Sequence, residues 1–320
     1  MRIININEQK AVSELSENDN FYILTHENPD GDTLGCACAL SIALNRMGKQ
    51  TKILCSDDIP DKYKFMFDNI DERNFNPSYI ITVDVSNKSL LGDKLKEYEN
   101  KVDLCIDHHV SNSDYAKYTL VNSSVASASE IIYNIINALG IEIDKEIAKC
   151  IYTGITTDTG CFKYSNVRPS THMKAAYLMT TGIDTSAINR LMFDNKSKSS
   201  IILQGLAIST LKTYLNDKCA IMYITKEMID SCSATNSDID GIVSISRQIE
   251  GILVGILIKE KDKNLYKVSV RTDESINACH ICEQFGGGGH PVAAGCTINN
   301  DDSLENVIKS IVEVVGKELS

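Results

Sequence analysis

Histidine and aspartate residues gather in four short segments of this sequence. Carboxylates and imidazoles without cysteine are ligands that suit Mn²⁺ and Mg²⁺. Several carboxylates packed together would repel one another unless cations neutralised them. A bridging aspartate with a ligand set on either side would hold two ions roughly 3.5–4 Å apart, as in two-metal phosphoester hydrolases. The residues that could form such a site are His26, Asp30 and Asp32 in the segment HENPDGD, Asp84, the run Asp107, His108 and His109, and Asp158.

Each of these aspartates also has an ordinary structural interpretation. An aspartate after a strand commonly caps the next helix, and Asn28-Pro29-Asp30-Gly31 has good turn chemistry. For any one residue alone, that interpretation is favoured. We favour a metal site because four separate segments carry the same two residue types.

A second pattern lies near the C-terminus, where Phe285 precedes four glycines and His290. Glycines let the backbone approach a ligand closely, and the N–H groups of Gly287, Gly288 and Gly289 could cradle an anion. Arg271, at the end of an expected strand, could supply a bidentate clamp for a phosphate. The alternative for the glycines is a flexible hairpin turn.

The first half of the chain alternates apolar strand-like runs with helical patterns, which predicts a parallel sheet covered by helices. Three of the histidine and aspartate segments come at the ends of expected strands, and Asp158 lies in a turn after an expected helix. Ligands of open α/β sheets gather beyond the carboxyl ends of strands, so the four segments point to one crevice. The expected strands are 21–25, 51–55, 79–85 and 102–106, and the expected helices are 32–48, 129–139, 144–156 and 171–181.

The second half predicts a smaller α/β domain with a mixed sheet. A helical pattern from residue 184 to about 217 has a charged middle, where we place the domain boundary. The domains are thus expected at 1–190 and 217–320, joined by a linker helix at 191–216. The smaller domain is expected to contain strands 220–225, 253–259 and 266–271 and helices 238–249 and 276–285.

Composition excludes several classes of protein. Hydrophobic residues make up 43% and charged residues 23% of the 320, which is typical of a globular protein rather than a disordered or collagen-like one. No apolar run approaches the ~20 residues that span a bilayer, so we expect a cytoplasmic protein without a membrane partner. The net charge of −11 disfavours long duplex nucleic acid. The 11 cysteines are expected to be reduced, and a zinc or redox site at Cys279, Cys282 and Cys296 is a weaker alternative to a packed helix.

These motifs together resemble the DHH-family phosphoesterases. His26-x-x-x-Asp30-x-Asp32 is similar to the family's first motif, Asp84 to the second, Asp107-His108-His109 to the third and Asp158 to the fourth. Arg271 with the GGGGH run resembles the family's associated C-terminal domain. The two-domain build most resembles the NrnA-type members, which degrade oligoribonucleotides a few residues long and dephosphorylate adenosine 3′,5′-bisphosphate (pAp).

The resemblance implies two Mn²⁺ ions, with Mg²⁺ or Co²⁺ as substitutes, and an active site in a cleft between the domains. One ion would be held by His26, Asp30 and Asp84, and the other by Asp32, Asp84, His108 and Asp158, with Asp84 bridging. His109 would face the scissile phosphate and Asp107 would orient a neighbouring imidazole. The far phosphate or nucleotide end would be bound by Arg271, His290 and the glycine loop, Gly287, Gly288 and Gly289 included. A homodimer is compatible with the resemblance.

Other functions share part of this pattern. The same chemistry could serve a cyclic-dinucleotide phosphodiesterase, a RecJ-like single-strand exonuclease or a pyrophosphatase. The GGGGH-bearing domain disfavours the pyrophosphatase, and the chain length disfavours the extra DNA-binding domains of RecJ-type enzymes. A nucleotide-binding regulator with an inactive site is the non-enzymatic alternative, which the full ligand set disfavours.

Overall fold

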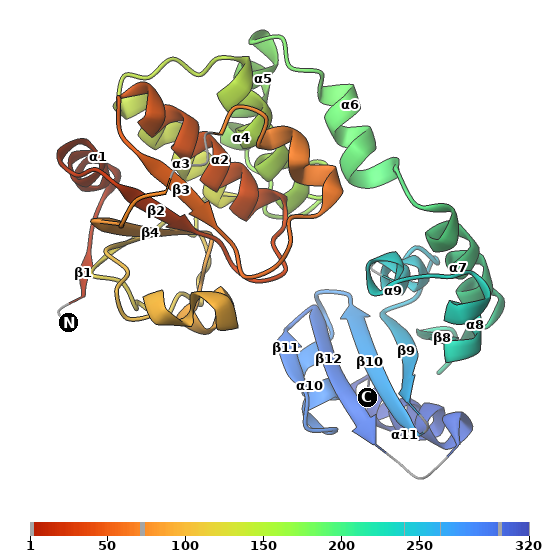
Figure 1. The fold of residues 1–320 in the computed structure, drawn as a ribbon. Helices are drawn as coiled ribbons and strands as arrows, with labels where there is room; N and C mark the ends of the chain where they lie inside the picture. The colour runs from red at the N-terminus through yellow and green to blue at the C-terminus, as the bar shows by residue number, and fades with distance from the viewer. Residues whose placement is uncertain (1–2, 71–73, 240, 263, 300–302, 320) are drawn as a thin grey trace. The chain divides into compact units, whose positions relative to one another are not determined.

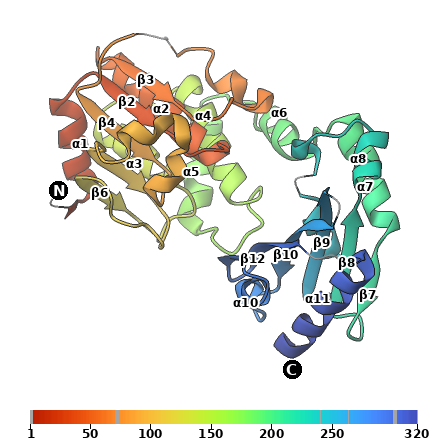
Figure 2. The same ribbon diagram turned by 60° about the horizontal axis from the view of Figure 1, so that its bottom comes forward.

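The structure is a computed structural model that describes residues 3–70, 74–239, 241–262, 264–299 and 303–319. Internal contacts divide the chain into an N-terminal unit, residues 1–195, and a C-terminal unit, residues 196–320. Each unit has its own sheet, as the ribbons of Figures 1 and 2 show. Each unit also has its own core of buried apolar side chains. No helix among the described residues is both long and apolar enough to cross a membrane.

The N-terminal unit is built on a six-stranded sheet in which every pair of neighbouring strands is parallel, as predicted. The central strands are almost wholly buried because both faces of the sheet are covered. In the spatial order β1-β6-β5-β4-β2-β3, the strands are Ile4–Asn5 (β1), Tyr118–Val121 (β6), Leu104–Asp107 (β5), Tyr79–Val83 (β4), Phe21–Leu24 (β2) and Thr51–Leu54 (β3).

The two faces of this sheet are covered differently. One face packs against long helices in a single large core, whereas the other packs against the short 3₁₀ segments η2 and η3 through Leu91 and Leu95 (Figure 1). The helical segments of the unit are Glu8–Glu17 (α1), Gly31–Arg46 (α2), Asp61–Met66 (η1), Lys88–Leu91 (η2), Asp93–Tyr98 (η3), Ala128–Ala138 (α3), Lys145–Asp158 (α4), Pro169–Thr180 (α5), Thr185–Asn189 (α6) and the π-helical turn Arg190–Asp194 (η4).

The order of the strands reverses between β2 and β4. Along the chain β2 is followed by β3 on one side, whereas β4 pairs with the other side of β2. In open α/β sheets, ligand sites form at such a reversal, beyond the carboxyl ends of the strands. His26 lies just beyond β2, Asp84 directly follows β4, and Asp107 is the last residue of β5. The topology therefore brings three of the four predicted segments to one edge of the sheet.

The C-terminal unit contains a mixed sheet, as predicted, because β8 and β9 are parallel and its other pairs are antiparallel. In the spatial order β11-β12-β10-β9-β8-β7, its strands are Gly288–His290, Ala293–Asn299, Leu265–Thr272, Val254–Asp262, Cys219–Ile224 and Lys212–Tyr214. Its helices are Lys198–Ser209 (α7), Lys226–Ser231 (α8), the 3₁₀ turn Asn236–Asp238 (η5), Ile242–Ser246 (α9), Ala278–Glu283 (α10) and Leu304–Glu318 (α11).

Two helix predictions are wrong. The segment 184–217, including the linker helix expected at 191–216, is broken into α6, a π-helical turn, α7 and β7, because Asn195 is extended and Ser197 starts a new helix by accepting from the Ser200 N–H. The helix expected at 238–249 shrinks to α9 behind Gly241, whose φ of +80° interrupts a helix. Residue 240 of that prediction lies outside the described residues.

Candidate metal centre

The segment after β2 places His26 and Asp30 side by side at the start of α2. Asp30 is the N-cap of α2 and accepts from the N–H groups of Asp32 and Thr33 at 3.0 and 3.1 Å. The Nδ1 atom of His26 lies 2.7 Å from the Glu27 carbonyl oxygen, which can only accept. Nδ1 therefore carries a proton, and Nε2 faces Asp30 Oδ1 at 3.7 Å. The capping role that a lone aspartate suggests is thus real, and it leaves His26 poised as a ligand.

Asp84 lies at the middle of the site. It has a φ of +57°, an uncommon conformation that Asp tolerates, and its N–H donates to the Ile106 carbonyl at 2.9 Å. Its carboxylate is 4% exposed and lies 3.5 Å from His108 Nε2 and 4.0 Å from His26 Nε2. Burial, with four neighbouring aspartates (Asp32, Asp30, Asp158 and Asp107), raises its pKa well above the ordinary range. Such a carboxylate ionises readily only if cations are present.

The carboxylate of Asp107 positions the His109 ring and belongs to none of the possible metal sets among the described residues. Its side chain is fully buried and accepts from the His109 Nδ1 atom and the Asn112 amide at 2.8 and 2.6 Å, and from the His108 N–H at 2.8 Å. Burial opposes ionisation of Asp107, but the hydrogen bonds from His109 and Asn112 lower its pKa overall. The same hydrogen bond, despite burial, raises the pKa of His109. The His109 Nε2 atom is therefore directed away from Asp107 and carries a proton over a wider pH range.

Asp32 and Asp158 approach His108 from two helices. Asp158 is the last residue of α4, not part of a turn as expected, and its Oδ2 lies 3.4 Å from His108 Nε2. Burial together with Asp32, Asp30 and Asp107 raises its pKa to about 8. Asp32 is fully buried and accepts from the N–H groups of Ala128 and Ser129, at 2.6 and 3.0 Å, where α3 begins. Burial raises the pKa of Asp32 as well.

The donor atoms fit divalent cations. Within the described residues, three sets each bring their ligand atoms within 4.8 Å of one another: His26, Asp30 and Asp84; Asp32, His108 and Asp158; and Asp84, His108 and His109. Asp84 Oδ1 and His108 Nε2 are buried without a hydrogen-bond partner. Buried polar atoms without partners are costly, and a cation at this position would satisfy both. All six residues predicted as ligands, and His109, therefore belong to overlapping sets joined through Asp84 and His108, with Asp107 bonded to His109.

Sequence reasoning missed the supports of this site. The side-chain amide of Asn112 donates to Asp107, and the first N–H group of α3 donates to Asp32. Asn166 Nδ2 donates to the carbonyls of Asp158 and Ala126 at 3.1 and 3.0 Å. A glycine in a helix interior is an unfavourable choice that signals close packing, and Gly154 in α4 is such a residue. The asparagines have no comparable signal in the sequence.

In the C-terminal pattern, the last two glycines and His290 form one strand of a hairpin. Gly288 to His290 form β11, and strand register places His290 opposite Ala293, which is itself opposite Arg271. His290 and Arg271 therefore share one row across the sheet. The N–H groups of Gly286 and Gly287 donate to the carbonyls of Glu283 and Cys282 at the end of α10, so Gly287, one of the three expected to bind an anion through its N–H group, is not free to do so. Within the described residues, no possible metal set includes Cys279, Cys282 or Cys296.

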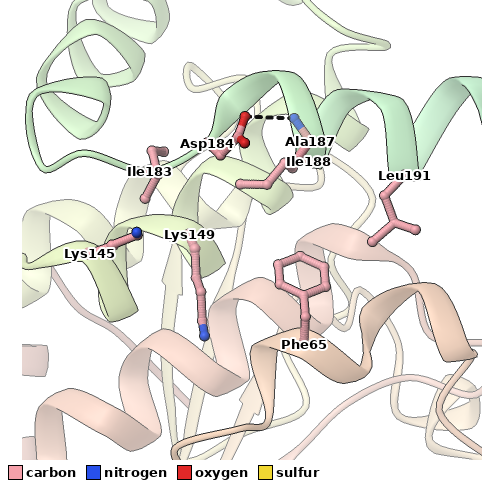
Figure 3. Close-up of a pocket in the computed structure, with 8 residues that line it drawn as sticks. All are labelled: Phe65, Lys145, Lys149, Ile183, Asp184, Ala187, Ile188 and Leu191. Carbon is pink, nitrogen blue, oxygen red and sulfur yellow. Dashed lines mark hydrogen bonds between the residues drawn. The ribbon is translucent and has the colours of Figure 1, made fainter.

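A separate hollow of about 300 Å³ lies in the N-terminal unit (Figure 3). It contains none of the predicted site residues and is mostly apolar, with the N-cap Asp184 accepting from the Ala187 N–H at 2.9 Å beside it. Its lining residues are Phe65, Lys145, Lys149, Ile183, Asp184, Ala187, Ile188 and Leu191. It is therefore distinct from the metal centre.

Comparison with known proteins agrees with this arrangement. The bifunctional oligoribonuclease and PAP phosphatase NrnA of Thermus thermophilus is 29% identical, over 93% of this chain and 90% of that protein. The crystal structure of an exopolyphosphatase-related protein from Bacteroides fragilis matches with a TM-score of 0.87 and 25% identity, over 97% of this chain and 96% of that chain.

A more distant structure shares the fold alone. RecJ of Thermus thermophilus, crystallised with Mn²⁺, matches with a TM-score of 0.55 and 14% identity, over 97% of this chain and 54% of the RecJ chain. In sequence, residues 20–155 match the DHH family, N-terminal domain, and residues 216–317 match the DHHA1 domain. The chain therefore carries a DHH-family N-terminal domain followed by a DHHA1 domain, as its motifs imply.

Proposed function

We propose that this protein hydrolyses short oligoribonucleotides such as pApA to mononucleotides, and removes the 3′-phosphate of pAp, with two Mn²⁺ ions as cofactors. One observation carries the proposal: the buried Asp84, whose Oδ1 has no hydrogen-bond partner among the described residues, belongs to two sets of possible metal ligands. The DHH and DHHA1 matches support phosphoester hydrolysis, and the name of the Thermus relative supports the substrate class.

The proposed ligands divide into two groups, and Asp84, whose Oδ1 lies 3.5 Å from His108 Nε2, would bridge them. His26 and Asp30 would hold one cation with it, and Asp32, His108 and Asp158 would hold the other. Two bound cations would neutralise charge on the phosphoryl oxygens and lower the pKa of the attacking water. Mg²⁺ or Co²⁺ could occupy the same oxygen and nitrogen donors.

His109 would act on the phosphoryl group or the leaving oxygen. Its Nδ1 is fixed by Asp107 at 2.8 Å, so only Nε2 can reach a substrate. Because that hydrogen bond raises the pKa of His109, the imidazolium is available to donate a hydrogen bond or a proton at Nε2. Asp107 orients the ring and does not itself exchange a proton, since its own pKa is lowered.

Arg271 and His290 would bind the other phosphate or the far nucleotide. They share a row of the C-terminal sheet with only Ala293 between them, and the adjoining residues Gly288 and Gly289 add no bulk. An arginine guanidinium can donate two parallel hydrogen bonds to a phosphate, and the small neighbouring residues leave room for it. The net charge of −11 favours short substrates over long polymers.

The test is product chromatography with pApA, pAp and cyclic di-AMP in separate Mn²⁺ reactions, each with a metal-free control. We expect conversion of pApA to AMP and of pAp to AMP and phosphate, with cyclic di-AMP untouched. Consumption of cyclic di-AMP alone would instead establish the cyclic-dinucleotide phosphodiesterase. Inertness toward all three, with activity on longer single strands, would establish a RecJ-like role, and nucleotide binding without turnover would establish a regulator.

Without metal, the thermal stability of the protein should fall as the pH rises, and bound metal should offset this loss. The pKa of Asp158 is about 8 in the folded protein, above the ordinary value of 3.8. Folding therefore retains a proton on Asp158 that the unfolded chain loses, and stability falls as the pH rises from about 4 toward 8. We expect the Tm of the chelated protein to be lower at pH 8 than at pH 6, and added Mg²⁺ or Mn²⁺ to raise it more at pH 8, because ionised ligands bind metal.

A matched variant separates this effect from general alkaline instability. Asp158→Asn cannot ionise, so the decline in Tm between pH 6 and pH 8 without metal should become shallower. An unchanged decline in that variant would contradict the assignment to Asp158.

A further inference from the structure

The segment that follows Asp158 is held rigidly. The Thr159 carbonyl accepts from the N–H groups of Lys163 and Tyr164 at 2.9 and 3.1 Å, and its hydroxyl accepts from the Phe162 N–H at 3.1 Å. The side-chain amide of Asn166 donates a hydrogen bond to the Asp158 carbonyl at 3.1 Å. Residues 159–166 therefore form a fixed loop attached to one of the proposed metal ligands.

The backbone of this loop takes an unusual path. Gly160, Cys161 and Phe162 have φ values of +55°, +59° and +62°, a conformation that L side chains rarely adopt. Residues in such conformations persist where the surroundings hold them, and they concentrate at functional sites. Here the path folds residue 164 back over residue 160.

The two aromatic rings of the loop have different environments. Phe162 is partly buried, with its ring centroid 5.2 Å from that of His172 and 6.2 Å from that of Tyr152. Tyr164 is 60% exposed, and its ring covers Gly160: a Cβ atom on Gly160 would lie 2.6 Å from both Cε1 and Cε2 of Tyr164. Phe162 thus anchors the loop to the core, whereas Tyr164 presents a supported aromatic ring to solvent.

We propose that Tyr164 is the stacking surface for the nucleobase of the nucleotide whose phosphate occupies the metal centre. This inference rests on the proposed function. Gly160, which the ring covers, is only two residues from Asp158, so the exposed ring belongs to the same hydrogen-bonded segment as a proposed metal ligand. A rigid ring costs little entropy to use, and stacking tolerates every base because each has a π-face. Lys163, exposed beside it, adds a positive charge for the nucleotide.

The sequence offers a direct probe, because the 320 residues contain no tryptophan. Tyr164→Trp places a single indole at the proposed site. Tyr177→Trp is the matched control and places one on α5, where Tyr177 is 44% exposed. Each Mg²⁺-loaded variant is titrated with AMP and with ribose 5-phosphate, which carries the same phosphate without a base. We expect AMP to quench the Tyr164→Trp variant saturably, ribose 5-phosphate to leave its emission unchanged, and the control variant to respond to neither.

Kinetics supply the second readout. Tyr164→Leu should raise the KM for pApA by roughly tenfold, as expected for loss of one base stack, with kcat unchanged. Tyr164→Phe keeps the ring and should retain the wild-type KM. If Tyr164→Leu lowers kcat and leaves KM unchanged, the ring supports the loop rather than the base.

Calorimetric titration of the wild-type protein with AMP separates the two proposals. If the wild type binds AMP while the indole of Tyr164→Trp does not respond, or responds equally to ribose 5-phosphate, the stacking site is wrong and the proposed function stands. A wild type that binds no AMP, and hydrolyses neither pApA nor pAp, overturns both.

Discussion

Replacing Asp84 by asparagine is expected to lower Mn²⁺-dependent hydrolysis of pApA by about 10³-fold or more, comparable with the loss of a group that stabilises charge in the transition state. Asparagine has nearly the same shape and tolerates the φ of +57° at this position. The lost activity would therefore report the missing charge. A variant with near-normal turnover in Mn²⁺ would show that the two-metal mechanism is wrong.

The same substitution should stabilise the protein when no metal is present. Burial and the neighbouring carboxylates of Asp32, Asp30, Asp158 and Asp107 raise the pKa of Asp84, so a charge there opposes folding at neutral pH. A neutral amide removes that cost. We expect a higher Tm in EDTA for Asp84→Asn, by about 2–4 °C for each kcal/mol gained. Stability and activity would thus change in opposite directions, as is common where charges are gathered for function.

Asp114→Asn is the matched control for this prediction. Asp114 also has a left-handed backbone, with φ of +50°, but it belongs to none of the possible metal sets among the described residues. Its replacement should change neither turnover nor the Tm in EDTA. Equal gains in Tm for both variants would attribute the effect to backbone preference rather than to the metal centre.

The second large effect is expected from Gly154→Ala in α4. A Cβ atom at residue 154 would overlap the Ser129 hydroxyl and lie 2.6 Å from Asp32 Oδ1. Asp32 cannot move aside freely, because Ala128 and Ser129 both donate to its carboxylate. We expect destabilisation of about 1–3 kcal/mol from overpacking. We also expect the Mn²⁺ concentration for half-maximal activity to rise by about 10–100-fold, because the carboxylate of Asp32, a proposed ligand, is displaced.

Gly205→Ala provides the contrast. Gly205 lies in α7, and no described atom outside that helix's own backbone comes within 4 Å of the position that a Cβ atom would take there. Alanine should therefore stabilise the protein by about 0.4–1 kcal/mol through the lower entropy of the unfolded chain. Urea denaturation measures both changes. If Gly154→Ala were as stable as Gly205→Ala, the close approach of α2, α3 and α4 at Asp32 would not be a constraint.

The positions of the candidate metal-site residues at the ends of the strands could be predicted because their signals are local. Asp84 directly follows the buried run of β4, and Asp107 ends β5, so the end of each strand marks its residue. The parallel pairing of these strands, also readable from their apolar character, then determines that the residues meet. The family motifs strengthened an inference that the residue types had already suggested.

The supporting contacts could not be predicted because they join distant elements through packing. Nothing near Asp32 in the sequence indicates that the first turn of α3, almost a hundred residues later, donates to it. The glycine run near the C-terminus also has no sequence signal for where its N–H groups go, and two of them are used by α10. The break at Asn195 was missed because a short non-helical stretch between two helices keeps helix-forming residues on both sides.

The spacing of the ligands along the chain has a consequence for how the molecule folds. The proposed ligands lie in four segments between His26 and Asp158, and they meet only where β2, β4 and β5 have paired. A partly collapsed chain that lacks these strand pairings would therefore offer no assembled site for a metal ion. Bound metal should accordingly slow the escape from the native state much more than it speeds arrival there. In a cell, a bound cation would then stabilise the folded protein against unfolding and would have little effect on how fast it folds.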